Sequence, residues 1–321
     1  MSTIQTFILR RLFKYSTPLL RGIEHRWMEK YGYETPLESP VFIVGAPRSG
    51  TTILYQLITY ATNCVYFDNL VNLARELPLL GVSLSQRWLA SRPHNSFNSI
   101  YGNTTKSGLH APSEAGQLWH RLLHSNAQNF KAETYSTQGL KQTRKIIYSI
   151  LNKYNKPIVT KNTYNSLRLE LLAKLHPKTK IIFVTRDPFY TAQSIFLARQ
   201  KWNQHLDDWW GVKSPNYQEL KNKHHLAQIV GQVYDLEKHI VDRKKLFPVN
   251  NWLDVHYEEL LNLPTLSHRL SNFLATDFFI STPVAQKIKV QNKVRVKPNI
   301  AHEIHTQIAL YDWVNYSSLI T

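Results

Sequence analysis

The strongest constraint on the fold is a short apolar segment that ends at a glycine-containing loop and precedes a helical pattern. Residues 40–44, Pro-Val-Phe-Ile-Val, are continuously apolar and include β-branched side chains, which is typical of a parallel strand buried on both faces. Residues 45–50 interrupt the apolar run. A helical period follows at Ile53, Leu54, Leu57 and Ile58. A strand, a glycine loop and a helix make the first half of a βαβ unit, so the segment predicts an α/β protein.

The same alternation of strands and helices recurs along the chain. Further strands are predicted at residues 157–160, 180–185 and 252–257, and helices at 167–176, 188–202 and 219–245. Alternation of this kind predicts a P-loop-like, three-layer fold with a central parallel sheet of about four to five strands flanked by helices.

The predicted strands also suggest how the chain is divided. We expect residues 1–38 to form a helical N-terminal arm and residues 39–321 to form a single α/β domain. A helical and loop insertion is expected at about residues 65–155, between the first two strands. Within it, residues 91–113 are rich in Asn, Ser, Gly and Pro and predict a long loop. An acceptor site is expected in such an insertion.

The charge of the chain predicts affinity for anions. Its 39 Lys and Arg against 22 Asp and Glu give a net charge of +17, which favours acidic partners without choosing among them. Cys64 is the single cysteine, so no intramolecular disulfide can form and a cytoplasmic location is expected. Residues 4–14 are basic and amphipathic but do not resemble a signal peptide. They predict either a surface helix or peripheral contact with an anionic membrane.

Residues 45–52, Gly-Ala-Pro-Arg-Ser-Gly-Thr-Thr, have the composition of a phosphate-binding loop. Glycines such as Gly50 let backbone N–H groups approach a phosphate, and the following helix points its N-terminus at the anion. The hydroxyls of Ser49, Thr51 and Thr52 can add donors. A nucleotide triphosphatase loop would carry lysine at position 51; here the basic residue is Arg48 instead. The loop is therefore suited to binding a phosphate but poorly equipped to hydrolyse ATP.

This loop resembles the 5′-phosphosulfate loop of sulfotransferases, in the branch with Pro-Arg-Ser-Gly-Thr-Thr that includes bacterial members and the tyrosylprotein sulfotransferases. A second match lies at residues 182–188, Ile-Phe-Val-Thr-Arg-Asp-Pro. Relatives carry an arginine at this strand end and a serine eight residues later. The resemblance implies that Arg186 and Ser194 bind the 3′-phosphate of 3′-phosphoadenosine-5′-phosphosulfate (PAPS), the co-substrate, and that no metal is required. Asp187 is expected to cap the next helix.

The resemblance also implies roles in sulfuryl transfer. Lys161, at the end of the second predicted strand, resembles the catalytic lysine, and with Arg48 it would face the leaving oxygens. Glu114, within Ala-Pro-Ser-Glu, resembles a general base, a buried carboxylate that takes the acceptor proton. Lys161 could instead be a solvated strand-end residue, and Glu114 could cap a helix beginning near Ser113. His110 is the rival base.

Two weaker matches lie further along the chain. Tyr257, at the end of the last predicted strand, could contact the cofactor or simply pack. Lys297, in a basic segment at residues 293–298, could contact a phosphate or remain solvated. The implied function is transfer of a sulfuryl group from PAPS to a hydroxyl or amine of a glycan, a peptide tyrosine or a small molecule.

Other function classes stay open at this point. A nucleotide kinase is disfavoured by Thr51 and by the lack of a magnesium-binding acid after a strand. A non-catalytic binder of acidic polymers is allowed by the charge and by Trp202, Trp209 and Trp210, although no nucleic-acid partner is expected. A metal site is not expected, because His120 and His124 have helical spacing but no third ligand. A serine nucleophile motif, G-x-S-x-G, is missing.

Overall fold

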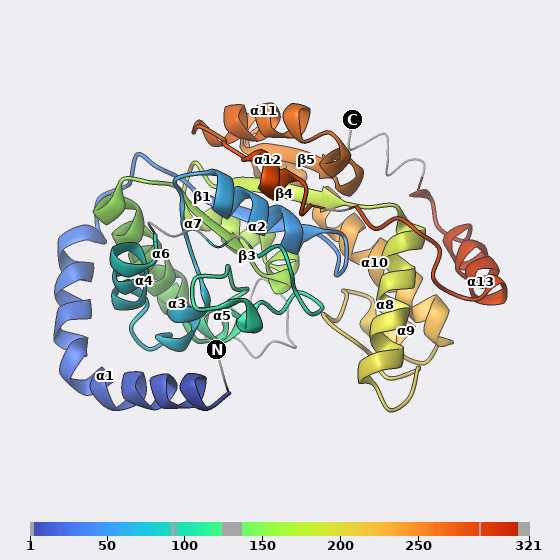
Figure 1. Cartoon of the computed structure of the whole chain (residues 1–321), viewed down its shortest axis with the longest axis horizontal. Helices are drawn as coiled ribbons and strands as arrows, with labels where there is room; N and C mark the ends of the chain where they lie inside the picture. The colour runs from blue at the N-terminus through green and yellow to red at the C-terminus, as the bar shows by residue number, and fades with distance from the viewer. Residues whose placement is uncertain (1–2, 91–93, 95, 124–136, 289, 314–321) are drawn as a thin grey trace.

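The computed structural model describes residues 3–90, 94, 96–123, 137–288 and 290–313 of the chain, with side chains from Arg11 onward. Five parallel strands form one sheet in the order β2-β3-β1-β4-β5 (Figure 1). Their bounds are β1 Pro40–Val44, β2 Val65–Tyr66, β3 Ile158–Lys161, β4 Lys180–Thr185 and β5 Trp252–His256. The chain therefore has the predicted α/β architecture, with the first predicted strand at the centre of the sheet.

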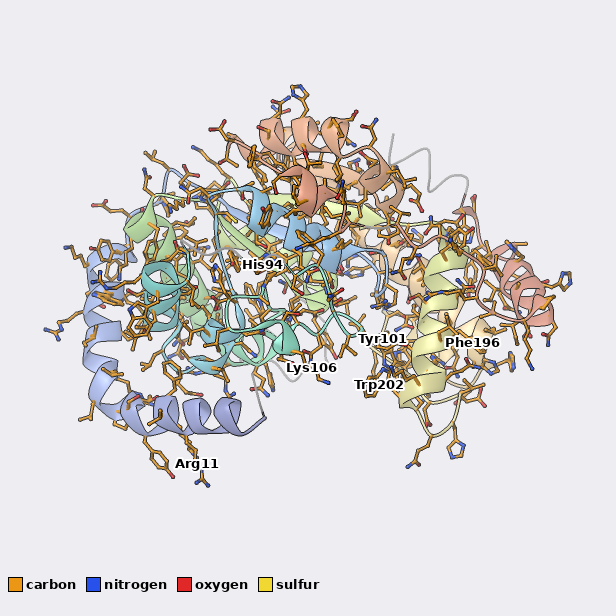
Figure 2. The ribbon with its side chains drawn as sticks, in the orientation of Figure 1. Arg11, His94, Tyr101, Lys106, Phe196 and Trp202 are labelled. Atoms are coloured by element: carbon orange, nitrogen blue, oxygen red, sulfur yellow. The ribbon has the colours of Figure 1, made fainter. Side chains whose placement is uncertain are left out.

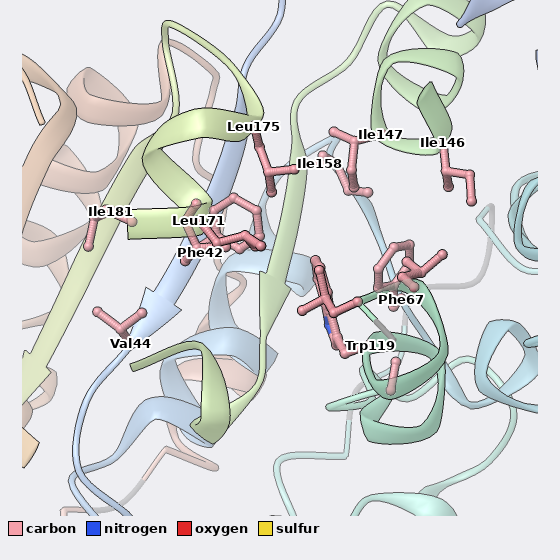
Figure 3. Packing of buried hydrophobic residues seen from close by; sticks show 14 of the residues in the cluster. Phe42, Val44, Phe67, Trp119, Ile146, Ile147, Ile158, Leu171, Leu175 and Ile181 are labelled. Atoms are coloured by element: carbon pink, nitrogen blue, oxygen red, sulfur yellow. The ribbon is translucent and has the colours of Figure 1, made fainter. Parts of the chain in front are cut away.

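Alternate residues of the central strand enter different cores, which is why the apolar run is continuous. Phe42 and Val44 pack with the cluster that contains Trp119 and residues of three helices, α5 Gly116–Leu123, α6 Thr137–Tyr154 and α7 Leu169–Leu175. Figure 3 shows part of this core. Val41 and Ile43 pack on the other face against α2 Thr51–Ala61 and α11 Leu263–Leu274. Helices thus cover both faces of the sheet and make three layers.

A third apolar cluster joins α8 Pro188–Trp202, α10 His225–Asp242 and α13 Pro298–Ile308. These helices lie together at one end of the molecule, opposite α1 Thr3–Tyr31 (Figure 1). The remaining α-helices are α3 Asn69–Leu73, α4 Pro78–Trp88, α9 Tyr217–Leu220 and α12 Thr282–Ala285. The 3-10 turns are η1 Thr105–Ser107, η3 Thr163–Leu167, η4 Lys244–Leu246, η5 Val249–Asn251 and η6 Tyr257–Leu261.

The longest predicted elements lie where expected, with corrections at their ends. The helix predicted at 219–245 is wrong in its bounds: α10 begins at His225, after the short α9 and a turn. The helix predicted at 167–176 is a 3-10 turn followed by α7, because the backbone of Arg168 leaves helical geometry between them. The two-residue strand β2 was not predicted, since two residues show no periodicity.

The N-terminal helix packs its inner face on the body. The buried carboxylate of Glu24 accepts hydrogen bonds from the backbone N–H groups of Leu79 (2.8 Å) and Leu80 (2.9 Å). Glu24 thereby caps α4, which has no side-chain cap of its own. Burial raises the pKa of Glu24. The division into an arm at 1–38 and one domain at 39–321 stays a prediction.

Candidate active site

A cavity of about 940 Å³ opens at the carboxyl ends of the parallel strands, where open α/β sheets bind their ligands. The segments after β1, β3, β4 and β5 all contribute to its wall. Nine of the candidate site residues from the sequence line it: Arg48, Gly50, Thr51, Thr52, Glu114, Lys161, Arg186, Ser194 and Tyr257. Ser49, His110 and Lys297 do not.

The loop after β1 leaves the start of α2 open to an anion. Gly50 precedes the helix in a left-handed conformation (φ 99°), and no side chain caps the helix. Arg48 also has a positive φ of 70°. The hydroxyl of Ser49 is fully buried and has no hydrogen-bond partner among the described residues. Uncapped N–H groups at a helix start, with an adjacent cation, suit a phosphate or sulfate group.

Gly50 is required by contact as well as by its backbone conformation. A Cβ atom at this position would overlap the ring of Tyr257. Tyr257 is buried, and its ring lies beneath the Arg186 guanidinium, whose central carbon is 4.5 Å from the ring centroid. The predicted Tyr257 thus packs between the loop and Arg186 and also borders the cavity.

Two arginines meet beside this loop without a carboxylate. Nε of Arg48 donates a hydrogen bond to Oγ of Ser194 at 2.9 Å, which joins the two sequence motifs. Arg186 bonds to the backbone carbonyl of Arg48 at 3.2 Å. Within the described part of the chain, neither arginine forms an ion pair with an acid.

The electrostatic consequence is a concentration of positive charge. Burial, followed by the nearby charge of Arg186, lowers the pKa of Arg48. Burial likewise lowers the pKa of Arg186; Tyr257, Glu258 and Asp187 act in the opposite direction, and Arg295 acts in the same one. Arginine remains charged in proteins, so an anion in the cavity would relieve this repulsion.

The C-terminal basic segment reaches the cavity, but not through the residue singled out in the sequence. Arg186 donates hydrogen bonds to the backbone carbonyl of Gln291 (2.7 Å) and to Oδ1 of Asn292 (2.9 and 3.0 Å). Arg295 lines the cavity, whereas Lys297 is exposed and precedes α13. The segment therefore closes over Arg186. Arg295, rather than the predicted Lys297, is the basic residue of this segment that lines the cavity.

Lys161 and Glu114 form an ion pair in the wall of the cavity. Lys161 is only 4% exposed, and its Nζ also lies 3.3 Å from Oγ1 of Thr52. Oε2 of Glu114 accepts hydrogen bonds from the backbone N–H (3.3 Å) and hydroxyl (3.2 Å) of Thr163. The alternative of a solvated strand-end lysine is therefore wrong.

The environment of Glu114 differs from both expectations. Its side chain is 31% exposed rather than buried, and α5 begins only at Gly116, so Glu114 is not in the first turn of a helix. His110 is hydrogen-bonded to Asp68 (3.2 Å) and Tyr66 (2.9 Å) and lines a separate cavity of about 320 Å³. The geometry favours Glu114 over His110 as the group facing the large cavity.

A tight turn in the predicted loop covers the ion pair. Ile100 and Asn103 exchange two backbone hydrogen bonds of 2.9 and 3.0 Å. The central residues, Tyr101 (φ 51°) and Gly102 (φ 89°), both have positive φ, as in type I′ turns. A Cβ atom on Gly102 would lie 3.1 Å from Oε1 of Glu114. The backbone of the turn therefore lies directly against the Glu114 carboxylate.

Aromatic side chains surround the tip of this turn. The Tyr101 ring lies 6.0 Å from that of Trp202 and 6.2 Å from that of Trp210, and Figure 2 shows Tyr101 and Trp202 next to one another. The Arg48 guanidinium lies 5.0 Å from the centroid of Tyr101. Trp209 packs elsewhere, against Tyr217. Tyr101 was not singled out in the sequence, although a Tyr-Gly pair between apolar and Asn residues is a turn signal.

Comparison with known proteins assigns the chain to a family. A sequence profile of the sulfotransferase family matches residues 40–278. The chain belongs to the sulfotransferase family.

Curated sulfotransferases from mycobacteria are similar to the chain. Omega-hydroxy-beta-dihydromenaquinone-9 sulfotransferase Stf3 of Mycobacterium bovis is 23% identical over 250 residues, which is 71% of this chain and 60% of that protein. The protein of the same name from Mycobacterium tuberculosis matches to the same extent. The chain thus spans about three fifths of the length of these relatives.

Solved sulfotransferases share the fold. Sulfotransferase STF9 from Mycobacterium avium superposes with a TM-score of 0.53 at 11% identity, covering 90% of this chain and 81% of that one. Sulfotransferase STF1 from M. tuberculosis gives a TM-score of 0.51 at 15% identity, covering 96% and 87%. These similarities support the sulfotransferase fold and do not address the acceptor.

Two further features bear on cofactors and membranes. Among the described residues, no group of three or more His, Cys, Asp or Glu side chains could hold a metal ion; His124 lies outside them. No helix in the described ranges combines the length and apolarity needed to cross a bilayer.

Proposed function

We propose that this sulfotransferase uses PAPS as its donor and transfers the sulfuryl group to an acceptor hydroxyl or amine. The observation that carries the proposal is the convergence of Arg48, Arg186 and Ser194 at the uncapped start of α2, where neither arginine forms an ion pair with an acid among the described residues. This arrangement fits a ligand that carries two separate anionic groups. The fixed guanidinium forks suit phosphate oxygens.

Different residues would hold the two ends of the donor. The N–H groups at the start of α2 and the hydroxyls of Thr51 and Thr52 are suited to the 5′-phosphosulfate. Arg186 and Ser194 are suited to the 3′-phosphate, with the segment at 291–295 closing over them. Tyr257 packs on Gly50 and Arg186 and holds both in place. When bound, PAPS supplies the sulfuryl group and leaves as 3′,5′-adenosine bisphosphate.

The ion pair lies between the donor and acceptor sides. Lys161 Nζ, beside Thr52, would place positive charge at the leaving side together with Arg48. A Glu114 carboxylate oxygen would accept the proton of the acceptor group. The hydroxyl of Thr163 donates a hydrogen bond to the Glu114 carboxylate, and Nδ2 of Asn162 donates one to the backbone carbonyl of Glu114 at 2.9 Å. These contacts would hold the carboxylate in position before the acceptor binds.

The acceptor would enter beside the turn at residues 100–103, which lies against Glu114, and near Trp210, whose ring lies 6.2 Å from that of Tyr101. A glycan, a peptide tyrosine or a small molecule, including a lipid, could present a hydroxyl there. The name of Stf3 gives it a hydroxylated menaquinone as its substrate, which adds a lipid hydroxyl to the acceptors worth testing. A cytoplasmic location, with Cys64 buried and unpaired, belongs to the same proposal.

Two substitutions test the assignment of roles. Arg186→Ala should weaken binding of 3′,5′-adenosine bisphosphate by more than ~100-fold, since a buried charge-assisted contact is lost. Arg186→Lys should recover only part of it, because a lysine cannot form the guanidinium fork. Arg144→Ala, an arginine bonded to carbonyls far from the cavity, is the matched control.

Glu114→Gln should leave bisphosphate binding unchanged and remove transfer of radiolabelled sulfate from PAPS to a panel containing a phenol, an oligosaccharide and a membrane lipid extract. His110→Gln should retain transfer if the protein folds. Full transfer by Glu114→Gln would contradict the base assignment, and unchanged binding by Arg186→Ala would contradict the donor site.

A further inference from the structure

The first half of α1 presents an apolar stripe to solvent. Leu12, Tyr15 and Leu19 are spaced by three and four residues, so they lie along one side of the helix. Their exposures are 59%, 72% and 84%. The opposite side contacts the body through Thr17, which is 4% exposed. The stripe is therefore not the face that attaches α1 to the protein.

The charges around this stripe are of one sign. Residues 1–23 contain four basic residues, Arg10, Arg11, Lys14 and Arg21, and no acidic residue. The first acid of the helix, Glu24, is buried and caps α4. Arg11, four residues before Tyr15, borders the stripe, and Lys14 and Arg21 are exposed on the opposite side of the helix. An apolar stripe on a helical segment whose charged residues are all basic is the pattern of helices that lie in the surface of an anionic membrane.

The shape of the helix also suits a planar surface. Pro18 lies inside α1, where it removes a helical hydrogen bond and favours a bend. Figure 1 shows that α1 bends and that its first half runs along one edge of the molecule, and Figure 2 shows Arg11 pointing outward there. On the other side of the helix, Lys14 and Arg21 line a cavity of about 630 Å³ between α1 and the body, together with Arg75 and Glu76.

We propose that the first half of α1 binds the surface of an anionic phospholipid bilayer, with Leu12, Tyr15 and Leu19 entering the interface, Arg11 beside them contacting headgroups and the other cations of the segment adding attraction to the anionic surface. The occupant is a lipid surface rather than a free anion, because the stripe itself is apolar. A second copy of the chain is disfavoured by the uniform positive charge on both partners. The binding does not depend on the donor or acceptor of the reaction.

The test is co-sedimentation of the full chain with vesicles. Vesicles with about a third phosphatidylglycerol should bind at least ~10-fold more protein than pure phosphatidylcholine vesicles, and added salt should weaken the binding. The double variant Leu12→Ser, Leu19→Ser should lose ~10-fold of the partitioning, since it removes apolar area from the interface. Lys14→Glu combined with Arg21→Glu should lose a similar factor and most of the salt dependence.

A matched control distinguishes the stripe from general stickiness. Leu37→Ser with Leu261→Ser removes two leucines of similar exposure, 83% and 76%, elsewhere on the surface, and should bind vesicles as the unaltered protein does. Calorimetric binding of 3′,5′-adenosine bisphosphate should be the same for all variants, which shows that they fold. The proposal is overturned if Leu12→Ser, Leu19→Ser binds vesicles normally, so that the net charge of +17 alone accounts for binding. It is also overturned if the stripe mediates self-association without lipid.

Discussion

The side of the cavity that we propose for the donor and the side that we propose for the acceptor are built in different ways. The donor side uses residues 45–52 and 186–194, two contiguous segments that follow adjacent strands β1 and β4. The acceptor side combines Tyr101 and Gly102 from a loop, Glu114 from before α5 and Trp210 from after α8. The first arrangement depends on strand ends that the sheet aligns, whereas the second depends on how a long loop packs.

This difference shows which parts of the cavity can be predicted from the sequence: those at strand ends can, and those on a long loop cannot. Parallel strands place their carboxyl ends at one edge of a sheet, so a motif after one strand meets a motif after the next regardless of the intervening chain. No comparable rule places the turn at residues 100–103 against Glu114. We therefore expect substitutions on the donor side to affect nucleotide binding, and those on the acceptor side to affect transfer alone.

The largest effect is expected at Gly50. Gly50→Ala must accommodate a positive φ and a clash with the Tyr257 ring, so binding of 3′,5′-adenosine bisphosphate should weaken by ~100-fold or more. Calorimetry measures the change. Gly22→Ala, where nothing lies within 4 Å of the added Cβ atom, should bind normally. Normal binding by Gly50→Ala would show that the loop geometry does not matter for the donor.

A smaller effect, on the rate of transfer rather than on nucleotide binding, is expected at Gly102. Its Cβ atom would press on the Glu114 carboxylate at 3.1 Å, so Gly102→Ala should lower the rate of transfer ~10- to 100-fold through misplacement of the base. Bisphosphate binding should stay unchanged. Gly108→Ala is the matched control, because Gly108 also has a positive φ (99°) but meets nothing within 4 Å. Equal losses in both variants would point to loop strain rather than to Glu114.

Removal of the Tyr101 ring should have a still smaller effect. Tyr101→Asn retains a residue that tolerates positive φ but loses the ring contacts with Trp202 and Trp210. The KM for the acceptor should rise ~3- to 10-fold, with the affinity for the bisphosphate within about twofold of normal. Steady-state kinetics and calorimetry together decide. A loss of nucleotide affinity as large as the rise in KM would mean that Tyr101 acts by positioning Arg48, whose guanidinium lies over its ring.

A last prediction, outside nucleotide binding and transfer, concerns the pH dependence of stability. Burial lowers the pKa of His94 from 6.5 to about 4, and its Nε2 contacts Oγ1 of Thr59 on α2 at 2.8 Å. Between these values the unfolded chain binds a proton that the folded chain does not, so stability is present above pH 6.5 and is lost as pH falls toward 4. The loss is at most about 3 kcal/mol.

Urea unfolding of the unaltered protein and of His94→Gln at several pH values measures this contribution. The variant should lose stability less steeply on acidification. Burial also lowers the pKa of His239, on α10, to about 4. His239 should therefore leave some dependence of stability on pH in the His94→Gln variant. Identical slopes in the two proteins would show that burial of His94 does not contribute to the loss of stability.

The fold was predictable where strands and helices are long and periodic. The apolar runs ending before Gly45 and Arg186 gave the positions of β1 and β4, because a strand buried on both faces has no polar interruption. The short β2 and the break at Arg168 were not predictable, since they arise from packing rather than from local pattern.

The donor residues of the candidate site were also predicted, and the structure brings Arg48, Arg186 and Ser194 together. Their roles stay predictions. Arg295, in place of Lys297 at the cavity, and Tyr101 were missed. The position of Arg295 depends on which side chains of an extended segment face inward. The position of Tyr101 depends on a turn whose sequence signal, a single Tyr-Gly pair, is weak by itself.

The most direct test of the donor site compares binding of 3′,5′-adenosine bisphosphate, 5′-AMP and ATP by calorimetry at two salt concentrations. The two arginines predict that the bisphosphate binds at least ~100-fold more tightly than 5′-AMP and more tightly than ATP. They also predict that this preference remains at high salt, because buried pairs are screened little. Equal binding of the bisphosphate and 5′-AMP, or no binding of either, would contradict the assignment of Arg186 and Ser194 to a 3′-phosphate.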